Sequence, residues 1–482
     1  MESIRVGLAL VVPWLAGALW IRAAWRGAAP AGIWPVALGY GYVLGLLVVT
    51  LLLRLQAALG LRLDFTAPLL VMAALALAGA WQLGRQGSGT APWASIMAVW
   101  RRQSAGQWLL FALLLAWLGW RFALLAQEIS LRPLYPWDAW TTWMVRPRVW
   151  AELHALVPFV DAARWLADPA GAAYTIDAWT YPYTVPLLAL WPTLAFGAWN
   201  EAAANLPWLG VALALGLGFY GQARLWGVLP LTALFYTWLL LSLPLLNAHV
   251  ALAGYADLWM MACFSLAMIA GLQWAREGCR WQGGLALLLA LAGPGIKLEG
   301  AVWLLLFIPV VLAARLRWPW FLATLGMLTA LGAFWWLAGG VVLTIPGLGE
   351  WVLRPDLIQI PYLGRFTLGY RGGWDPVVKN FLLLANWHLF WYLMLVALGV
   401  SVVTLPRQRA ERWRWAGLAF VGASLLALFV LFFMTDAQLW AEQYTSINRV
   451  FLDFVPALLF WALTVFVPPR PASGSEAADT LS

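Results

Sequence analysis

Long apolar runs separated by short polar turns occupy most of the chain. Each run is about as long as a helix must be to cross a bilayer, which takes about 20 residues. The thirteen runs lie at about 6–22, 34–53, 66–83, 108–126, 203–222, 226–246, 252–273, 283–296, 300–314, 319–338, 380–404, 415–434 and 449–467. The pattern predicts an all-α polytopic membrane protein with about thirteen transmembrane helices.

Two polar stretches interrupt this pattern, at residues 127–202 and 339–379. Inside the first, residues 182–198 (PYTVPLLALWPTLAFGA) are apolar but carry three prolines and a glycine near their end. Proline disfavours a helix interior, and glycine often follows a helix end. We therefore expect this segment to form an interfacial or re-entrant helix that does not cross the membrane.

The arginines test this assignment. If residues 182–198 do not cross, one side of the membrane receives fifteen basic residues in short loops and the other side receives five. The positive-inside rule places the richer side in the cytoplasm. The N-terminus and both long polar stretches then lie outside, and residues 468–482 form a cytoplasmic tail. The sequence thus predicts a multi-pass protein of the bacterial cytoplasmic (inner) membrane.

Composition agrees with this class. Hydrophobic residues make up 63% of the chain and charged residues only 10%, whereas a soluble domain is about 25% charged. The net charge of +8 follows from the arginine-rich cytoplasmic loops. It therefore gives no reason to expect binding to nucleic acid.

Ionisable residues at the outer ends of the helices are the candidates for chemistry, because such groups are costly in a membrane and usually functional. Asp138 follows the fourth run, and Asp257 begins a helix in GYADLWMM. Lys297 and Glu299 occupy a turn in GIKLEGAVW, and Arg449 begins the last helix in NRVFLDFVP, with Asp453 one turn later. Together they predict an outward-facing site that holds an anion with two cations and uses a carboxylate as a base.

Each candidate also has a structural interpretation. Asp138 is suited to cap the helix that AWTTWMV would form, because aspartate is favoured at that position. Lys297 and Glu299 are placed to pair with each other at a helix junction. Arg449 is suited to extend toward a lipid headgroup. The sequence alone leaves these alternatives open.

In the order of these landmarks the chain resembles the GT-C integral-membrane glycosyltransferases, which use polyprenyl-phosphate sugars. Protein O-mannosyltransferases and the aminoarabinose transferases of lipid A belong to this family. The shared landmarks are a long outer loop with an early acidic residue (YPWDAW), an apolar segment ending in glycine (YPYTVPLLALWPTLAFG), a second aspartate opening a helix (GYADLWMM), a KLEG turn and a late arginine (NRVFLDFVP). The resemblance covers about 108–467, and it differs in Asp-Ala where many members carry Asp-Glu and in three additional N-terminal helices.

The resemblance implies a division of the chain into functional parts. Residues 1–107 would be three extra transmembrane helices, and 108–338 a catalytic membrane core that includes the outer loop 127–202. Residues 339–379 would form a second outer loop, and 380–467 the C-terminal transmembrane helices.

The resemblance also implies roles for particular residues. A sugar would move from a polyprenyl-phosphate donor to a hydroxyl of a glycan, lipid or protein acceptor, with Asp138 as general base. Lys297 and Arg449 would hold the donor phosphate, and Asp257 would orient Asp138 or the acceptor. Further substrate contacts are expected from Glu299, Arg146, Arg148, Trp140, Tyr181 and His249. No cofactor or metal site is assigned, and use of a divalent cation stays open.

Two other classes of protein fit the composition. A transporter or flippase of a lipid-linked glycan would also have many spans and few internal charges, but transporters often contain internal repeats and none is evident between the halves of this chain. A scaffold of the cell envelope would give Asp138, Lys297 and Arg449 no role. A glycosyltransferase accounts best for these residues.

Overall fold

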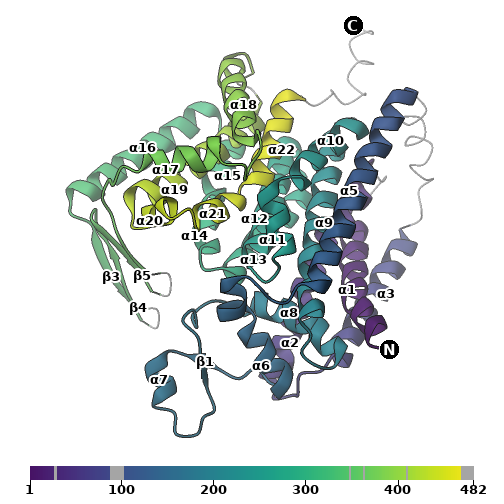
Figure 1. Ribbon diagram of the computed structural model, residues 1–482. Coiled ribbons are helices and arrows are strands. Elements are labelled where there is room, and N and C mark those ends of the chain that lie inside the picture. Colours follow the sequence, from purple (N-terminus) through teal and green to yellow (C-terminus); the bar gives the residue numbers. More distant parts are fainter. Residues whose placement is uncertain (26–29, 87–102, 347–348, 362–363, 409–410, 468–482) are drawn as a thin grey trace.

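The computed structural model describes residues 1–25, 30–86, 103–346, 349–361, 364–408 and 411–467; the predicted tail 468–482 lies outside them. Among these residues, nine helices are long and apolar enough to cross a membrane (Figure 1). They are α1 (Glu2–Ala24), α2 (Ile33–Ala58), α3 (Thr66–Arg85), α5 (Ala105–Leu131), α9 (Glu201–Leu225), α12 (Asp257–Glu277), α16 (Trp318–Leu337), α18 with η3 (Phe390–Thr404, Leu405–Arg407) and α19 (Arg412–Met434). The chain is therefore a mainly helical, multi-pass membrane protein.

The other predicted spans are short or interrupted in the structure. Helices α10 (Pro230–Leu241) and α11 (Pro244–Ala251) replace the run 226–246 and meet at an angle of 63°. The shorter apolar helices are α13 (Arg280–Ile296), α14 (Gly300–Leu305), α15 (Phe307–Arg315), α21 (Ile447–Leu452) and α22 (Val455–Phe466). Prolines stand in the first turns of α10, α11 and α22, where proline suits the start of a helix but not its interior. The apolar runs did not reveal these breaks.

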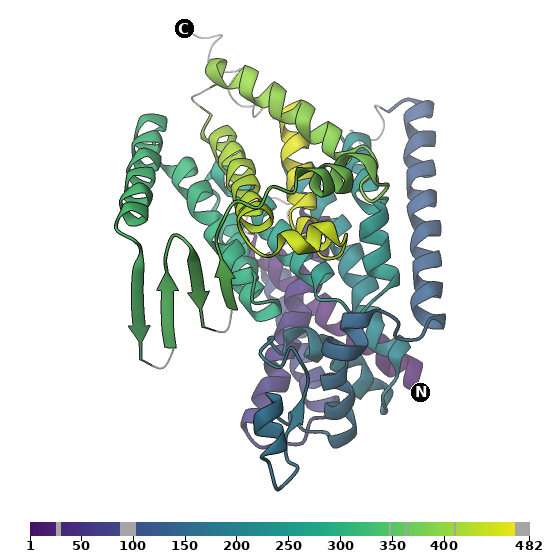
Figure 2. The same ribbon diagram turned by 60° about the vertical axis from the view of Figure 1, so that its left-hand side comes forward.

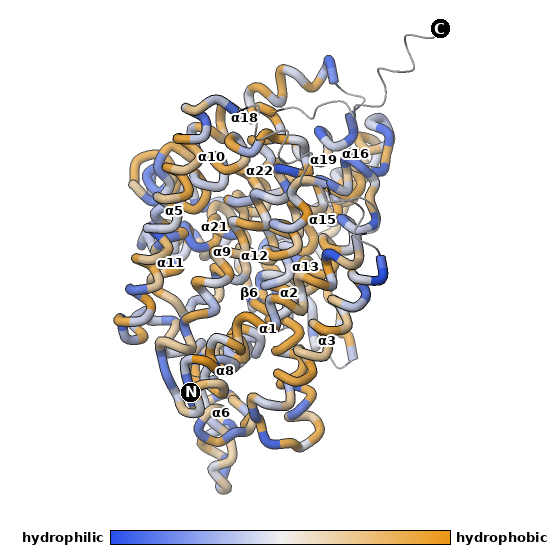
Figure 3. Tube along the Cα trace, turned by 90° about the vertical axis from the view of Figure 1, so that its right-hand side faces the viewer, coloured by the Kyte–Doolittle hydropathy of each residue, from blue (hydrophilic) through white to orange (hydrophobic). Residues whose placement is uncertain are grey.

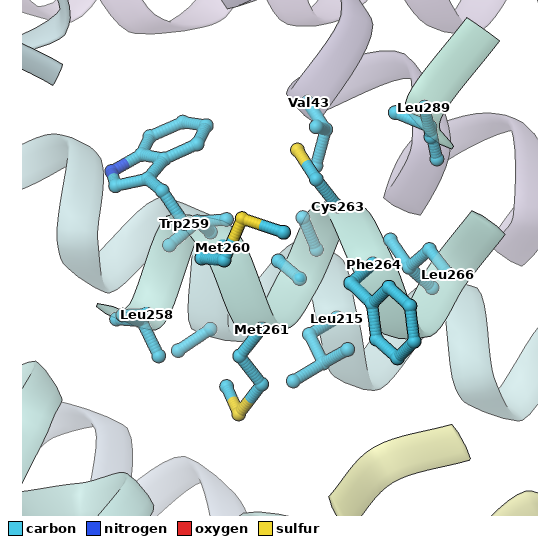
Figure 4. Close-up of a cluster of buried hydrophobic side chains, with 14 of the residues drawn as sticks. Val43, Leu215, Leu258, Trp259, Met260, Met261, Cys263, Phe264, Leu266 and Leu289 are labelled. Carbon is cyan, nitrogen blue, oxygen red and sulfur yellow. The ribbon is translucent and has the colours of Figure 1, made fainter. Parts of the chain in front are cut away.

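Helix α12 lies at the centre of the protein. Every residue from Asp257 to Gln273 on it is buried, because α9, α13, α15, α19 and α22 pack around it. Its sequence LWMMACFSLAMIAG is apolar on all sides, as expected for a helix enclosed by other helices. Figure 4 shows the side chains of Trp259, Met260, Cys263 and Phe264 projecting from it in different directions. The first residue of α12 is thus held on the most enclosed of the nine candidate spans in the described part of the chain.

The N-terminal helices pack directly onto this core. Helix α2 lies against both α1 and α9. At Gly39 the backbones of α2 and α9 come so close that a Cβ atom would overlap the Gly218 backbone of α9. Small residues allow this approach between membrane helices. Residues of α1 and α2 therefore contribute to the same packed unit as the central helix.

The segment after α5 forms a cap. It contains the π-helix η1 (Ala139–Trp143), α6 (Val145–Leu153), β1 (Phe159–Val160), α7 (Ala162–Leu166), β2 (Tyr174–Thr175) and α8 (Thr184–Phe196), with β1 and β2 paired in parallel. Helix α8 is the predicted non-crossing segment and has 13 residues, or about 20 Å at 1.5 Å per residue. All of them except Phe196 are buried, so protein encloses this helix.

A four-stranded antiparallel sheet occupies the second polar stretch. Its strands follow one another in the order β3 (Val341–Ile345), β4 (Gly349–Leu353), β5 (Leu357–Ile360) and β6 (Gly364–Thr367). Figure 2 shows the sheet on the side of the molecule opposite α5, next to α16. Residues 339–379, predicted as a loop of an all-α protein, instead contain this sheet.

The remaining helices complete one side of the core. They are α17 (Trp374–Val378), the π-helix η2 (Lys379–Leu383) and α20 (Gln438–Glu442), which lie near α18, α19 and α21. Helix α1 begins at the end of the molecule that carries α6 and α7, whereas α22 ends at the opposite end (Figure 1). Hydrophobic positions dominate most of the helices between these two ends (Figure 3).

Candidate functional site

Asp257 lies at the centre of a cluster of charged side chains. It is the first residue of α12 and is only 1% exposed. Its Oδ1 accepts a hydrogen bond from Lys297 Nζ at 3.2 Å, and its Oδ2 accepts hydrogen bonds from Arg449 Nη2 at 2.8 Å and Nε at 3.2 Å. One buried carboxylate therefore holds two cations that come from distant parts of the chain.

Arg449 connects this centre to the cap. Its Nη1 lies 2.6 Å from Asp138 Oδ2, and its guanidinium lies over the Tyr255 ring at 4.3 Å. Asp138 precedes η1 but makes no side-chain capping hydrogen bond among the described residues. It is 36% exposed, compared with 21% for Arg449. Asp138 thus pairs with Arg449 instead of capping η1. Arg449 pairs with two carboxylates instead of extending away from the protein.

Lys297 connects the centre to a second carboxylate. It follows α13 directly, and its Nζ lies 3.6 Å from Glu299 Oε1. The Tyr181 hydroxyl, from the cap, donates to the same oxygen over a long 3.5 Å. Burial, together with the nearby Glu299 charge, raises the pKa of Tyr181 to about 12. Its hydroxyl therefore stays protonated and able to donate at neutral pH.

These contacts form an alternating row of five charges: Asp138, Arg449, Asp257, Lys297 and Glu299. The row contains three carboxylates and two cations, so it carries one excess negative charge when every group is ionised. The central carboxylate is buried, whereas the terminal ones are 36% and 38% exposed. Breaking a partly exposed ion pair costs less free energy than breaking a buried one. An incoming anion would therefore displace the terminal carboxylates first.

Two more of the predicted residues lie just behind the row. Arg146 is fully buried and donates to the carbonyl oxygens of Ala178, Trp179 and Tyr181 at 3.3, 2.6 and 2.8 Å. Burial lowers its pKa to about 10, so it remains a cation at neutral pH and fixes the backbone that carries Tyr181. His249 is buried with its ring centre 5.6 Å from that of Tyr255, which lies under Arg449.

The structure does not bring the other two predicted residues into the row. Arg148 is 63% exposed and pairs with Glu152 at 3.5 Å on the outer surface of α6. Trp140 is 48% exposed and contacts Trp137 edge to face. Seven of the ten predicted residues thus form or directly support the charged row, and Arg146 supports it through the backbone.

Three neighbours of the row were not predicted as site residues. Tyr255 provides the aromatic face for Arg449. Asp453 is 3% exposed, and its Oδ2 accepts a hydrogen bond from Trp303 Nε1 at 3.1 Å. Asp453 is also close enough to Lys297 to interact with it electrostatically. The sequence offered a signal for Asp453, which is one helical turn from Arg449, but the Trp303 contact joins residues 150 positions apart.

An apolar cavity of about 460 Å³ lies beside α21, the helix that carries Arg449. Its wall is formed only by apolar side chains of α17, η2, α18, α19, α21 and α22, among them Phe381, Trp391, Phe429, Phe432, Phe451 and Trp461. Phe451 is two residues from Arg449 on the same helix. Two positions along a helix correspond to a rotation of about 200°, so the cavity and the charged row lie against different faces of this short helix.

No group of three or more histidine, cysteine, aspartate or glutamate residues is arranged to hold a metal ion in the described part of the chain. Asp138 and Asp257 instead face the Arg449 guanidinium. The comparisons with known proteins add no family to this geometry: the chain has no significant match among protein-family models, curated proteins or solved structures.

Proposed function

We propose that the protein is a GT-C-type glycosyltransferase that moves a sugar from a polyprenyl-phosphate donor to an acceptor hydroxyl at the outer face of the cytoplasmic membrane. The observation that carries this proposal is the row of charges, in which one buried carboxylate holds two cations, on a helix whose other face lines an apolar cavity. A polyprenyl phosphate has the same two parts, an anionic head and a long apolar tail. The resemblance in sequence landmarks supports the same assignment.

The donor would bind by exchanging ion pairs. Its phosphate replaces Asp138 on Arg449 and Glu299 on Lys297, while buried Asp257 keeps both cations in place. Arginine and lysine form strong charge-assisted hydrogen bonds with phosphate oxygens. The prenyl chain would pass around α21 to reach the apolar cavity, whose 460 Å³ falls in the range of about 300–1,000 Å³ typical of ligand sites.

The exchange would also prepare the base. Once Arg449 holds the phosphate, the Asp138 carboxylate is free to accept the proton of the acceptor hydroxyl. The acceptor oxygen forms a bond to the anomeric carbon, and the bond from that carbon to the phosphate oxygen breaks with its electron pair remaining on the phosphate. Lys297 and Arg449 stabilise the additional negative charge that the leaving phosphate gains.

We also propose that the chain crosses the membrane thirteen times. Thirteen crossings would need α13, α14 with α15, and α21 with α22 to cross as short or broken spans, together with the bent pair α10–α11. Helix α8 would stay on the outer side. The start of α1 and the end of α22 lie at opposite ends of the molecule (Figure 1), which fits an odd number of crossings. The additional helices α1 to α3 would then brace the core through α2 and α9.

Binding of radiolabelled polyprenyl phosphate to the purified protein tests the proposal without knowledge of the sugar. We expect binding of polyprenyl phosphate but much weaker binding of the matching polyprenol, which lacks the phosphate. Lys297→Gln should weaken phosphate binding about ten- to a hundredfold, the range for loss of a hydrogen bond to a charged group. Lys379→Gln is the matched control, because Lys379 is the other lysine of the sequence and pairs with Asp375 on the surface.

A panel of radiolabelled polyprenyl-phosphate sugars, added to the protein in vesicles that carry envelope acceptors, then tests for transfer. Equal affinity for the phosphate and the alcohol would contradict the proposed site. Equal losses in the Lys297 and Lys379 variants would contradict it as well. Movement of the donor across the vesicle membrane without transfer would favour a flippase instead.

A further inference from the structure

A second cavity, which is polar, lies at the opposite end of the central helix from the candidate site. It has a volume of about 390 Å³ and is formed where α12 and α15 end and α19 begins. Asp257 and Glu277 are the first and last residues of α12, so they lie about 30 Å apart at 1.5 Å per residue. That distance equals the thickness of the hydrocarbon core of a bilayer. This inner cavity therefore belongs to the other membrane surface.

The charges that line the inner cavity are unevenly paired. Three arginines and two glutamates contribute to its wall: Arg276, Arg315, Arg412, Glu277 and Glu411. Arg276 lies 3.7 Å from Glu277, and Glu411 is engaged at 2.8 Å by Arg414, a buried residue outside the lining. Within the described residues, neither Arg315 nor Arg412 has a carboxylate within ion-pair distance. Two arginines of the cavity thus remain available to an anion.

The aromatic residues of the cavity place these arginines. The Arg315 guanidinium carbon lies 4.1 Å from the centre of the Trp274 ring, and Arg412 Nη1 donates to the Arg315 carbonyl oxygen at 3.3 Å. A guanidinium that lies over an aromatic face keeps its N–H groups at the ring's edge, where they can form two parallel hydrogen bonds to a phosphate. Trp274 and Trp413 also line the cavity, and tryptophan is enriched at membrane interfaces.

The position of the cavity selects the source of the anion. The positive-inside rule assigns the arginine-rich ends of these helices to the cytoplasm, and the cytoplasmic leaflet carries the anionic lipids. Basic cavities between helices on this side are suited to phospholipid headgroups. A phosphate attached to lipid arrives at this depth with its acyl chains already in the membrane beside α15, whose Ile308 and Val311 are exposed.

From this geometry we infer that the cavity between Trp274, Arg315 and Arg412 binds the phosphate of an anionic phospholipid from the cytoplasmic leaflet. The site is independent of the chemistry proposed around Asp257. A bound lipid would bridge the ends of α12, α15 and α19, and it would therefore also stabilise the packing of α15 and α19 around the central helix.

Native mass spectrometry of the intact protein tests this inference. The protein is released from nanodiscs that contain phosphatidylglycerol and phosphatidylcholine in equal amounts, and the lipid that stays bound is identified. We expect retained phosphatidylglycerol on the wild type and at least a tenfold loss of it in Arg315→Gln/Arg412→Gln. Arg315→Lys, which keeps the charge but loses the planar donor pair, should retain an intermediate amount.

Arg85→Gln is the matched control, because Arg85 also stacks on a tryptophan, Trp81, at 4.8 Å but does not line the cavity. It should keep the wild-type lipid. The thermal unfolding midpoint of each variant in phosphatidylcholine alone shows whether the protein remains folded. Unchanged retention of phosphatidylglycerol in the folded double variant would overturn the inference. Displacement of the lipid by millimolar inorganic phosphate would overturn the assignment to a membrane lipid.

Discussion

Asp138→Asn should slow sugar transfer without weakening donor binding. Asp138 occupies Arg449 Nη1 at 2.6 Å where the donor phosphate is proposed to bind, so the wild-type site must break this pair first. The pair is 36% exposed on the Asp138 side, and such pairs contribute about 0–1 kcal/mol. Removing the charge should therefore leave polyprenyl phosphate affinity unchanged or increase it by up to about fivefold. Transfer should fall about 10²–10⁴-fold, the usual contribution of a general base.

Both quantities are measurable on one preparation. Equilibrium binding of radiolabelled polyprenyl phosphate gives the affinity, and single-turnover release of polyprenyl phosphate from the sugar donor gives the rate of transfer. The single-turnover measurement separates the chemical step from product release, which the variant would also change. A fall in affinity that matches the fall in rate would refute the exchange of Asp138 for phosphate. Retention of the wild-type transfer rate would refute its role as the base.

Asp257→Asn provides the internal comparison because the same substitution is made at the buried end of the same arginine. Here both Lys297 and Arg449 lose their shared anion, and breaking a buried ion pair costs about 3–5 kcal/mol. We expect a clear fall in the unfolding midpoint, followed by the fluorescence of the 37 tryptophans, and weaker donor binding. Asp138→Asn should leave the midpoint almost unchanged. Equal midpoints for both variants would show that Asp257 is not the anchor of the cations.

Three further substitutions test how the site is supported. Arg146→Gln should lower the unfolding midpoint and expose the cap to proteolysis, because the three backbone carbonyls that it satisfies lose charged donors worth up to about 3 kcal/mol each; an unchanged cleavage pattern would argue against this role. Tyr181→Phe should weaken donor binding less than about tenfold, since its 3.5 Å hydrogen bond to Glu299 is long; a larger loss in the binding assay would indicate a direct contact with the donor. Gly300→Ala should cost about 1–3 kcal/mol and reduce donor binding, because its Cβ would overlap the Gly293 backbone and shift the turn before α14; wild-type values in both measurements would contradict this.

The sequence indicated which residues are candidates for the site, but it did not indicate which of them contact one another. Asp257, Lys297 and Arg449 each lie where an apolar run begins or ends. Antiparallel helices return their ends to the same surface, so alternation of the runs was enough to place the three residues on one side. Which of them would touch depended on the packing of α12 among its neighbours, and a single sequence does not contain that information.

The contrast between Arg146 and Arg148 shows the same limit at short range. The two residues are separated by two positions on α6, which corresponds to a rotation of about 200° around the helix. One of them must therefore face inward when the other faces outward. The apolar pattern of VRPRVWAEL does not decide between them, because the polar groups that receive Arg146 are backbone carbonyls of residues 178–181. The pattern of side chains along the sequence does not show where such backbone acceptors lie.

The strands of the second polar stretch were missed for a different reason. Residues 341–345 (VVLTI) are apolar and β-branched, which is typical of a strand. They follow the apolar helix α16 after three residues, however, and the length and charges of the whole stretch favoured a loop. A sheet in this place depends on pairing between consecutive short strands. That pairing becomes visible only when each short run is considered as one strand of a meander.

The arrangement of the charged row explains why a buried ion cluster suits exchange of ligands. Asp257 begins α12, where the helix dipole favours a negative charge, and its burial keeps water from competing for Lys297 and Arg449. The two cations would therefore stay in position whether their other partner is a carboxylate or the proposed phosphate. In the proposed exchange one phosphate would replace both Asp138 and Glu299, and Asp257 would keep each cation paired while this happens. A site built from the two cations without Asp257 would lose this property, since it would lack the fixed anion that holds Lys297 and Arg449 together when their outer partners leave.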